Sequence, residues 1–194
     1  GGLASVLAGA QIAAEKATDD AEALTLARST AFHALSLILR ALQAAMESNA
    51  MEREPRGPSW TEAVRAALED AITSKALAST TPVRTWLCKC LVACFAFPAV
   101  AHHLYGTMKS FQQLATTKSS SALTRTCVVE AMGELSKAYG TKIASIAQDS
   151  VGALGKQLAL REMSLRRSAL AAVTGVLMGT ENVSTPKVGL WTSP

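Results

Sequence analysis

The sequence has few aromatic residues, few charged residues and no long apolar run. Aromatic side chains make up 5% of its 194 residues and charged side chains 18%. The most apolar stretch, 90–101, is only 12 residues long and contains Pro98, whereas a membrane-spanning helix needs about 20 apolar residues. The first residues carry no charged segment of the kind that opens a signal peptide. We therefore expect neither a membrane span nor a secretory leader.

Cysteine is also scarce, and its spacing excludes a disulfide framework. Three of the four cysteines, Cys88, Cys90 and Cys94, fall close together in one apolar segment. Free buried thiols in a reducing compartment are the expected state, so the sequence predicts a cytoplasmic protein. Cys90 and Cys94 are one helical turn apart and could face one zinc ion, but no CxxC pair accompanies them. We expect both thiols to be reduced, buried and free of metal.

The abundant residues are those that favour helices. Alanine occurs 36 times and leucine 23 times, together about 30% of the chain, and 49% of all residues are hydrophobic. With a net charge of only +4, this composition indicates a folded, all-α protein rather than a disordered chain. The length suits one domain with a sizeable core.

Arginine marks an internal repeat. Arg84, Arg125 and Arg166 are each the second residue of a similar segment. The interval from Arg84 to Arg125 equals the interval from Arg125 to Arg166. Arg28 precedes Arg84 by a longer interval, and the excess coincides with a polar insert that contains Pro55, Gly57 and Pro58. A period of about 41 residues with two helices per unit is typical of HEAT and armadillo solenoids. We therefore predict a right-handed HEAT-type α-solenoid of about eight helices in antiparallel pairs.

Apolar periodicity and capping residues place those helices. One solenoid segment is expected over 1–179, with an exposed insert at 49–59 and an irregular tail at 180–194. Gly140 is expected to be a C′ glycine, and the last helix is expected to end at Gly179. The predicted helices cover 2–17, 20–48, 60–72, 81–97, 101–115, 122–139, 143–158 and 163–178. The second is expected to be covered on more than one side, because its apolar stripe is widened by Leu26, Phe32, Leu37 and Leu39. Ser121 is expected to cap the sixth, and the third is expected to bury Val64, Leu68, Ala71 and Ile72. Neither end shows a polar capping repeat, which predicts a segment cut from a longer array.

The repeat units resemble a known family. The runs Val83–Cys94 and Thr124–Leu135 are similar to HEAT repeats, with a hydrophobic residue, an arginine and then small residues. The acidic residue that precedes the arginine in that family is missing from most units. Residues 82–178 most resemble the large HEAT-repeat accessory proteins of the trans-Golgi and endosomal clathrin adaptor, chiefly through the run Cys127–Gly140. The resemblance implies a non-catalytic scaffold that binds adaptor or coat proteins at the periphery of Golgi or endosomal membranes.

A search for catalytic chemistry gives no candidate. The adjacent His102 and His103 point about 100° apart on a helix and cannot chelate one ion. The run Gly152–Lys156 departs from the phosphate-loop pattern at both ends. We expect no enzyme activity and no cofactor. In HEAT arrays the second helix of each pair lines the concave side, as the resemblance implies, and our candidates for partner binding are the outward residues of those helices: Arg65, Lys109, Gln113, Lys142, Ser145, Gln148 and Lys156.

Charge divides the chain unevenly and leaves a second function open. Residues 1–79 carry 7 basic and 10 acidic side chains, whereas residues 80–194 carry 12 basic and 5 acidic ones. The basic half could bind an acidic peptide, anionic lipid or nucleic acid. The bases are dispersed and lack interleaved aromatic residues, so a protein-binding scaffold is favoured over a nucleic-acid-binding HEAT module.

The last predicted helix lacks a following partner. Its residues Leu165, Leu170, Val173 and Leu177 would leave apolar area bare, which favours association. Two alternatives follow: either the tail around Trp191 folds over this helix, or another molecule covers it.

Overall fold

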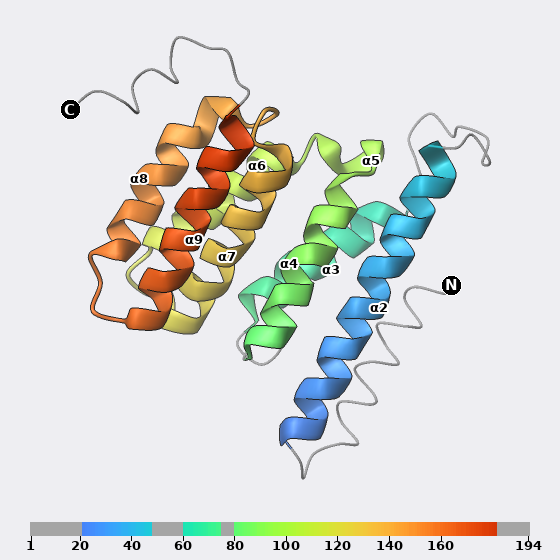
Figure 1. The fold of residues 1–194 in the computed structure, drawn as a ribbon, viewed down its shortest axis with the longest axis horizontal. Helices are drawn as coiled ribbons and strands as arrows, with labels where there is room; N and C mark the ends of the chain where they lie inside the picture. The colour runs from blue at the N-terminus through green and yellow to red at the C-terminus, as the bar shows by residue number, and fades with distance from the viewer. Residues whose placement is uncertain (1–20, 48–59, 75–79, 182–194) are drawn as a thin grey trace. The chain divides into compact units, whose positions relative to one another are not determined.

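The computed structural model describes residues 21–47, 60–74 and 80–181. Within these ranges the chain forms eight α-helices and one short 3-10 helix, and no strand, which confirms the all-α prediction. Contacts divide the chain into two compact units, Gly1–His102 and His103–Pro194. Figure 1 shows the helices of each unit.

In the N-terminal unit α4 is the central helix. The unit contains α2 (Ala21–Glu47), α3 (Trp60–Thr73), α4 (Thr81–Phe95) and the single turn α5 (Pro98–Ala101). α4 packs against both α2 and α3, and α2 and α4 run in the same direction (Figure 1). Because neighbours cover it on two sides, α4 is apolar around most of its circumference and buries its thiols as well as Leu87 and Leu91.

Proline fixes the ends of α4. Thr80 is extended and Pro82 lies in the first turn, where no intrahelical amide donor is needed. Pro98 begins α5, and the preceding Phe97 is extended, as expected for a residue before proline. Pro98 therefore ends one helix and starts another rather than kinking a continuous one.

The C-terminal unit consists of two helix pairs. It contains α6 (Leu104–Thr116), α7 (Ala122–Tyr139), the 3-10 helix η1 (Ala144–Ile146), α8 (Ala147–Leu158) and α9 (Met163–Thr180). α6 contacts α7, and α8 contacts α9, within each pair; α6 also contacts α8, and α7 contacts α9. The helices expected to be second in their pairs, α6 and α8, are therefore first in the pairs defined by these contacts. Ser121 caps α7 as the sequence predicts, since its Oγ accepts a hydrogen bond from the Thr124 amide at 3.1 Å.

The two pairs stack with a nearly constant offset along the chain. Lys109 donates a hydrogen bond to Asp149, 40 residues later, and Gln112 donates one to Ser150, 38 residues later. Ser168 bonds Glu130 across 38 residues. Equivalent helices of the two pairs therefore lie parallel and in register. The interval from Arg125 to Arg166 reflects the same geometry, because each is the fourth residue of its helix. Arg84 is likewise the fourth residue of α4.

Small residues bring α7 and α9 into close contact. A Cβ added to Gly133 would lie 2.7 Å from the Cα of Ala172, and one added to Gly175 would lie 2.5 Å from the carbonyl oxygen of Gly133. A Cβ on Gly179 would collide with the Ser136 carbonyl oxygen, and one on Gly140 with Gly179. These glycines allow two helix backbones to approach where any side chain would separate them.

This contact corrects the expected role of Gly140 and Gly179. Gly140 has right-handed helical angles, φ −52° and ψ −36°, so it is not a left-handed C′ residue. α9 continues through Gly179 to Thr180. Both glycines are present because of interhelical distance, which a local capping rule does not consider.

Several other boundaries differ from expectation. The predicted fifth helix is divided: α5 ends at Ala101 and α6 begins at Leu104. The predicted seventh helix begins as the 3-10 turn η1. On α2 the fully buried residues include Leu35 and Leu39, whereas Leu26 and Leu37 are 68% and 54% exposed. The expectation that α2 is covered on more than one side is therefore wrong at these two residues.

Other expectations are confirmed or lie outside the described ranges. Val64, Leu68, Ala71 and Ile72 form the buried face of α3 as predicted. The predicted helix 2–17, the insert 49–59 and the segment 182–194 are not among the described residues.

Candidate functional site

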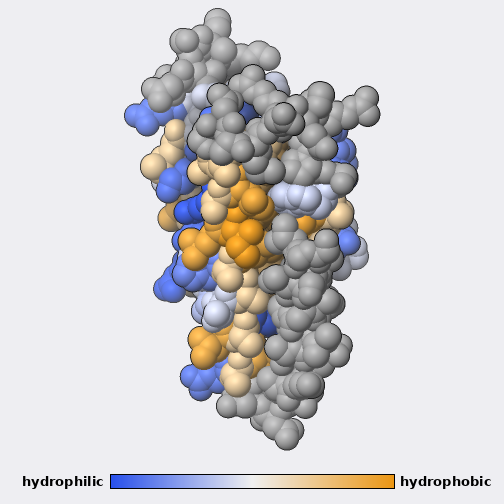
Figure 2. All heavy atoms as spheres, turned by 90° about the vertical axis from the view of Figure 1, so that its right-hand side faces the viewer, coloured by the Kyte–Doolittle hydropathy of each residue, from blue (hydrophilic) through white to orange (hydrophobic). Residues whose placement is uncertain are grey.

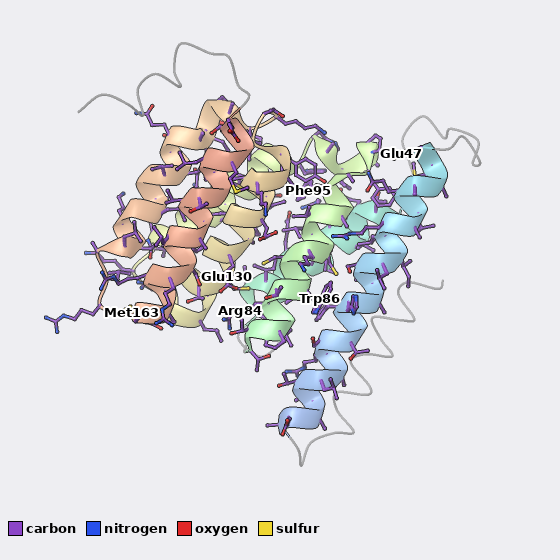
Figure 3. All side chains as sticks on the ribbon, viewed as in Figure 1. Glu47, Arg84, Trp86, Phe95, Glu130 and Met163 are labelled. Carbon is purple, nitrogen blue, oxygen red and sulfur yellow. The ribbon has the colours of Figure 1, made fainter. Side chains whose placement is uncertain are left out.

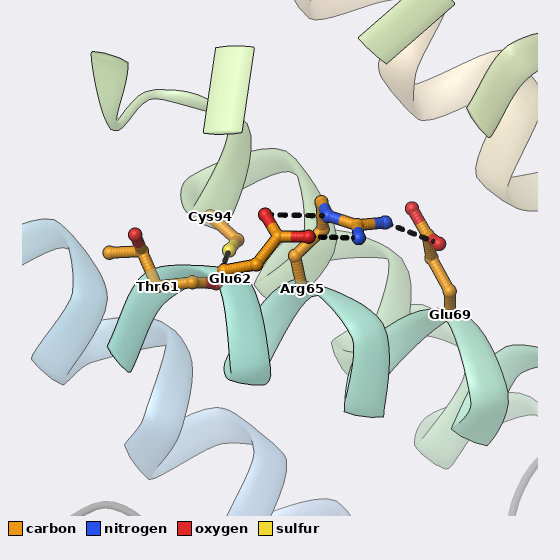
Figure 4. Close-up of polar contacts among 5 residues, drawn as sticks. All are labelled: Thr61, Glu62, Arg65, Glu69 and Cys94. Atoms are coloured by element: carbon orange, nitrogen blue, oxygen red, sulfur yellow. Dashed lines mark hydrogen bonds and ion pairs between the residues drawn. The ribbon is translucent and has the colours of Figure 1, made fainter. Parts of the chain in front are cut away.

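Arg65, the candidate in the N-terminal unit, is held by carboxylates of its own helix. Its Nη2 lies 2.5 Å from Glu62 Oε1, and its Nη1 lies 2.6 Å from Glu69 Oε2 (Figure 4). The side chain is only 12% exposed. Hydrogen bonds to Glu62 are the main reason that the pKa of the Arg65 guanidinium is raised. Arg65 therefore stabilises α3 locally and presents little free charge.

The other six candidates lie in the C-terminal unit, where Lys109 joins α6 to α8. Its Nζ lies 2.6 Å from Asp149 Oδ2, and this hydrogen bond raises the pKa of the Lys109 ammonium. Beside it, buried Gln112 donates from Nε2 to Ser150 Oγ at 2.8 Å. Ser150 in turn donates to the Ile146 carbonyl at 3.0 Å. An exposed ion pair and a buried hydrogen-bond chain thus connect the same two helices.

The remaining five candidates are exposed along α6, η1 and α8. They are Gln113 on α6, Lys142 and Ser145 before α8, and Gln148 and Lys156 on α8. The Lys142 ammonium lies 5.3 Å from the Tyr139 ring centroid, close enough for a cation–π contact. We call these five residues the α6–α8 polar face. The sequence correctly predicts that they point outward.

The repeat arginines do not share one role. Arg84 is buried and donates to Thr81 Oγ at 3.1 Å. Arg125 donates to the Ser120 carbonyl at 2.9 Å and to the Lys118 carbonyl at 3.2 Å, and so orders the turn before α7. Arg166 is exposed. The first two arginines organise helix starts, whereas the third is available to a ligand.

The thiols are buried as the sequence predicts. Cys90 Sγ donates to the Phe32 carbonyl at 3.0 Å, and Cys94 Sγ to the Thr61 carbonyl at 3.7 Å. Burial raises the pKa of Cys90 and that of Cys94 to about 12. A protonated, enclosed thiol is a poor nucleophile and a poor metal ligand. Across the described part of the chain, no three His, Cys, Asp or Glu side chains are grouped to hold a metal ion.

One aromatic stack was not anticipated from the sequence. The exposed His33 ring on α2 stacks on Trp86 of α4 with centroids 3.9 Å apart, and the Lys89 ammonium lies 4.5 Å from the same Trp86 ring. Trp86 lies where α4 faces α2 (Figure 3). The spacing of Trp86 and Lys89 could have indicated their contact, but the pairing with His33 depends on how α2 and α4 pack.

Exposed apolar side chains gather on α2 and on α9. The view onto α2 shows hydrophobic side chains at the surface (Figure 2). On α9, Leu170 and Leu177 are 61% and 47% exposed, as predicted for a helix with one bare side. Leu165 was expected on that side but is buried, since it lies on the opposite face of α9.

No protein-family model, no curated protein and no solved structure matched the chain.

None of the helices in the described ranges is both long enough and apolar enough to cross a membrane.

Proposed function

We propose that this protein is a non-catalytic, protein-binding scaffold built as a right-handed HEAT-type α-solenoid. The observation that carries the proposal is the parallel, in-register stacking of α6 on α8 and of α7 on α9. Stacked helix pairs of this kind expose long surfaces along their length, and such surfaces are how solenoids bind partners. The resemblance to accessory proteins of the clathrin adaptor supports a role in vesicle traffic.

The α6–α8 polar face is the proposed partner-binding surface. Two of its five residues, Lys142 and Lys156, are basic, and the other three are neutral hydrogen-bonding side chains. Lys109 adds little charge because Asp149 neutralises it. A protein segment that offers carboxylates and hydrogen-bonding groups complements this surface.

A paired capture experiment tests this function. The full chain, the double variant Gln148→Glu/Lys156→Glu and the control Lys137→Glu are immobilised and exposed to the same cytosolic extract. Lys137 is exposed on α7, so its variant changes surface charge away from the α6–α8 polar face. We expect at least one protein to bind the wild type and the control but not the double variant, with far-UV circular dichroism unchanged. Equal capture by all three chains would contradict the assignment of this surface.

A nucleic-acid-binding HEAT module is the second candidate function. It is favoured by Arg161, Arg166 and Arg167, which are exposed around the start of α9. Binding of a labelled DNA duplex, measured by fluorescence polarisation at increasing salt, separates the two functions because phosphate contacts give a steep salt dependence. The scaffold function predicts no salt-dependent binding, whereas tight binding lost on Arg166→Glu/Arg167→Glu would favour the alternative.

A further inference from the structure

The outward side of α9 forms a regular apolar stripe. Met163, Leu170 and Leu177 recur at heptad spacing and therefore lie within about 40° of one another around the helix. All three are large exposed hydrophobic side chains. The opposite side of α9, with Ala172 and Gly175, is buried in the unit. The stripe is thus a narrow seam of the kind through which two helices pair.

Opposite charges flank the central part of this stripe. Arg166 lies on the same side of α9 one turn before Leu170, and Glu181 lies one turn after Leu177. Both side chains are exposed, and neither makes an ion pair or a side-chain hydrogen bond with another residue in the described ranges. Each charge is therefore available to a partner that docks along the stripe.

The stripe is not built to continue the stacking of α7 on α9. The α7 residues that touch α9 closely are Gly133, Ser136 and Gly140. Shifted by the interval from Arg125 to Arg166, the corresponding positions of α9 are Thr174, Leu177 and Glu181. Larger side chains have replaced the small ones, so another helix could not approach α9 as closely as α9 approaches α7. A helix that binds the stripe must instead accommodate the protruding Leu170 and Leu177 side chains, with Arg166 at one end and Glu181 at the other.

We propose that the part of the stripe between Arg166 and Glu181 binds the same part of a second copy of this chain, with the two α9 helices antiparallel about a twofold axis. In the register that places Arg166 beside Glu181 of the second copy, Leu170 meets Leu177 and Val173 meets Thr174. The twofold axis repeats every contact, so both ends carry an Arg–Glu pair and the centre is apolar. A parallel arrangement would instead place Arg166 beside Arg166.

The contact is short, which sets the expected strength of the dimer. The paired region, from Arg166 to Glu181, is about 24 Å long, so its area falls at the low end of specific interfaces. We expect a reversible dimer that forms at micromolar to millimolar concentration. This self-association uses α9 and is independent of the proposed partner surface on α6 and α8.

Charge reversal gives a specific test on the full chain. Sedimentation velocity over a range of concentrations measures the monomer–dimer equilibrium of the wild type, Arg166→Glu and Glu181→Arg. Each single reversal places like charges at both ends of the dimer, and we expect it to raise the dissociation constant about tenfold. Lys137→Glu serves as the matched control and should leave the equilibrium unchanged. Leu170→Glu should abolish the dimer while circular dichroism shows an intact fold.

Mixing the two single reversals is the decisive measurement. Each variant repels itself. In a heterodimer of Arg166→Glu with Glu181→Arg, one end carries the original Arg–Glu pair and the other end carries the same pair with its two charges exchanged, so both ends attract. The mixture should therefore dimerise more tightly than either variant alone, and the double reversal in one chain should dimerise about as tightly as the wild type. A wild type that stays monomeric at every concentration, a dimer indifferent to these reversals, or a mixture no tighter than its components would overturn the proposal. So would a chain that dimerises only after residues 182–194 are removed, because the tail would then be the occupant.

Discussion

At the scale of single residues, glycine has two opposite roles in the C-terminal unit. Gly133, Gly140, Gly175 and Gly179 lie where α7 and α9 meet, and a Cβ at any of them would clash with the facing helix. Gly152 and Gly155 lie on exposed positions of α8, where an added Cβ would meet no atom within 4 Å. The same residue type is therefore required in one helix and dispensable in another.

Alanine substitutions at these glycines should change stability in opposite directions. Gly152→Ala is expected to raise the free energy of unfolding by about 0.5–1 kcal/mol, because alanine is the better helix former. Gly133→Ala is expected to lower it by about 1–3 kcal/mol, because α7 and α9 must move apart. Urea denaturation followed by circular dichroism measures both. Equal effects of the two substitutions would contradict the close contact between α7 and α9.

The buried thiols of Cys90 and Cys94 should make the free energy of unfolding fall at alkaline pH. Their pKa of about 12 exceeds the usual value of 9.0, so between these values the unfolded chain loses protons that the folded chain retains. The contribution of these thiols to the free energy of unfolding is therefore fully present below pH 9. Between pH 9 and about 12 it falls by about 1.4 kcal/mol per thiol for each pH unit. Urea denaturation at several pH values, compared with Cys90→Ala/Cys94→Ala, isolates this contribution. If the two proteins show the same pH dependence, the thiols are not enclosed as described.

At the scale of the elements, α6 and α8 are joined by one buried and one exposed polar contact. The Lys109–Asp149 pair is open to solvent, with side chains 36% and 60% exposed, and exposed ion pairs contribute little to stability. The Gln112–Ser150 hydrogen bond is buried, and the loss of a buried partner leaves a desolvated polar group unsatisfied. The buried contact should therefore dominate.

Removal of each contact tests this ranking. Ser150→Ala should lower the free energy of unfolding by about 1–3 kcal/mol, since the Gln112 amide loses its acceptor. Asp149→Asn should leave the urea midpoint nearly unchanged. If Asp149→Asn lowered the free energy of unfolding more than Ser150→Ala, the exposed ion pair would be the stronger of the two contacts and the ranking would be wrong.

At the scale of the whole molecule, the chain consists of two compact units. In the C-terminal unit, Met108, Phe111, Met132 and Leu154 are fully buried. A core of this kind can fold without the rest of the chain.

The segment 103–194 should therefore fold when expressed alone. We expect a helical circular dichroism spectrum and a single cooperative thermal transition. Gly133→Ala in this segment should lower the transition temperature, as it lowers stability in the full chain. A segment that is helical but melts without cooperativity would show that the N-terminal unit is needed to complete its core.

The sequence by itself determined the helical class, most helix positions and many buried faces. α7 begins at Ala122 and ends at Tyr139 as predicted, because the cap at Ser121 and the apolar period of α7 are local signals. The equal arginine spacing also located equivalent helices, since a repeated unit must repeat its local pattern. Exposure of the α6–α8 polar face followed from the same periodicity.

Only the tertiary structure decided which side chains already interact with a neighbouring residue. Arg65 was a candidate for partner binding, yet Glu62 and Glu69 engage it, and Lys109 was another, yet Asp149 from the next helix pair engages it. Gly140 was expected as a left-handed C′ residue and Gly179 as the end of a helix, but Gly140 is right-handed, α9 continues to Thr180, and the distance between two backbones explains both glycines. Helical periodicity gives the direction of a side chain from its own helix, but it contains no information about which helix lies opposite. That choice depends on packing between segments far apart in the sequence, such as α7 and α9, and it leaves one side of α9 exposed.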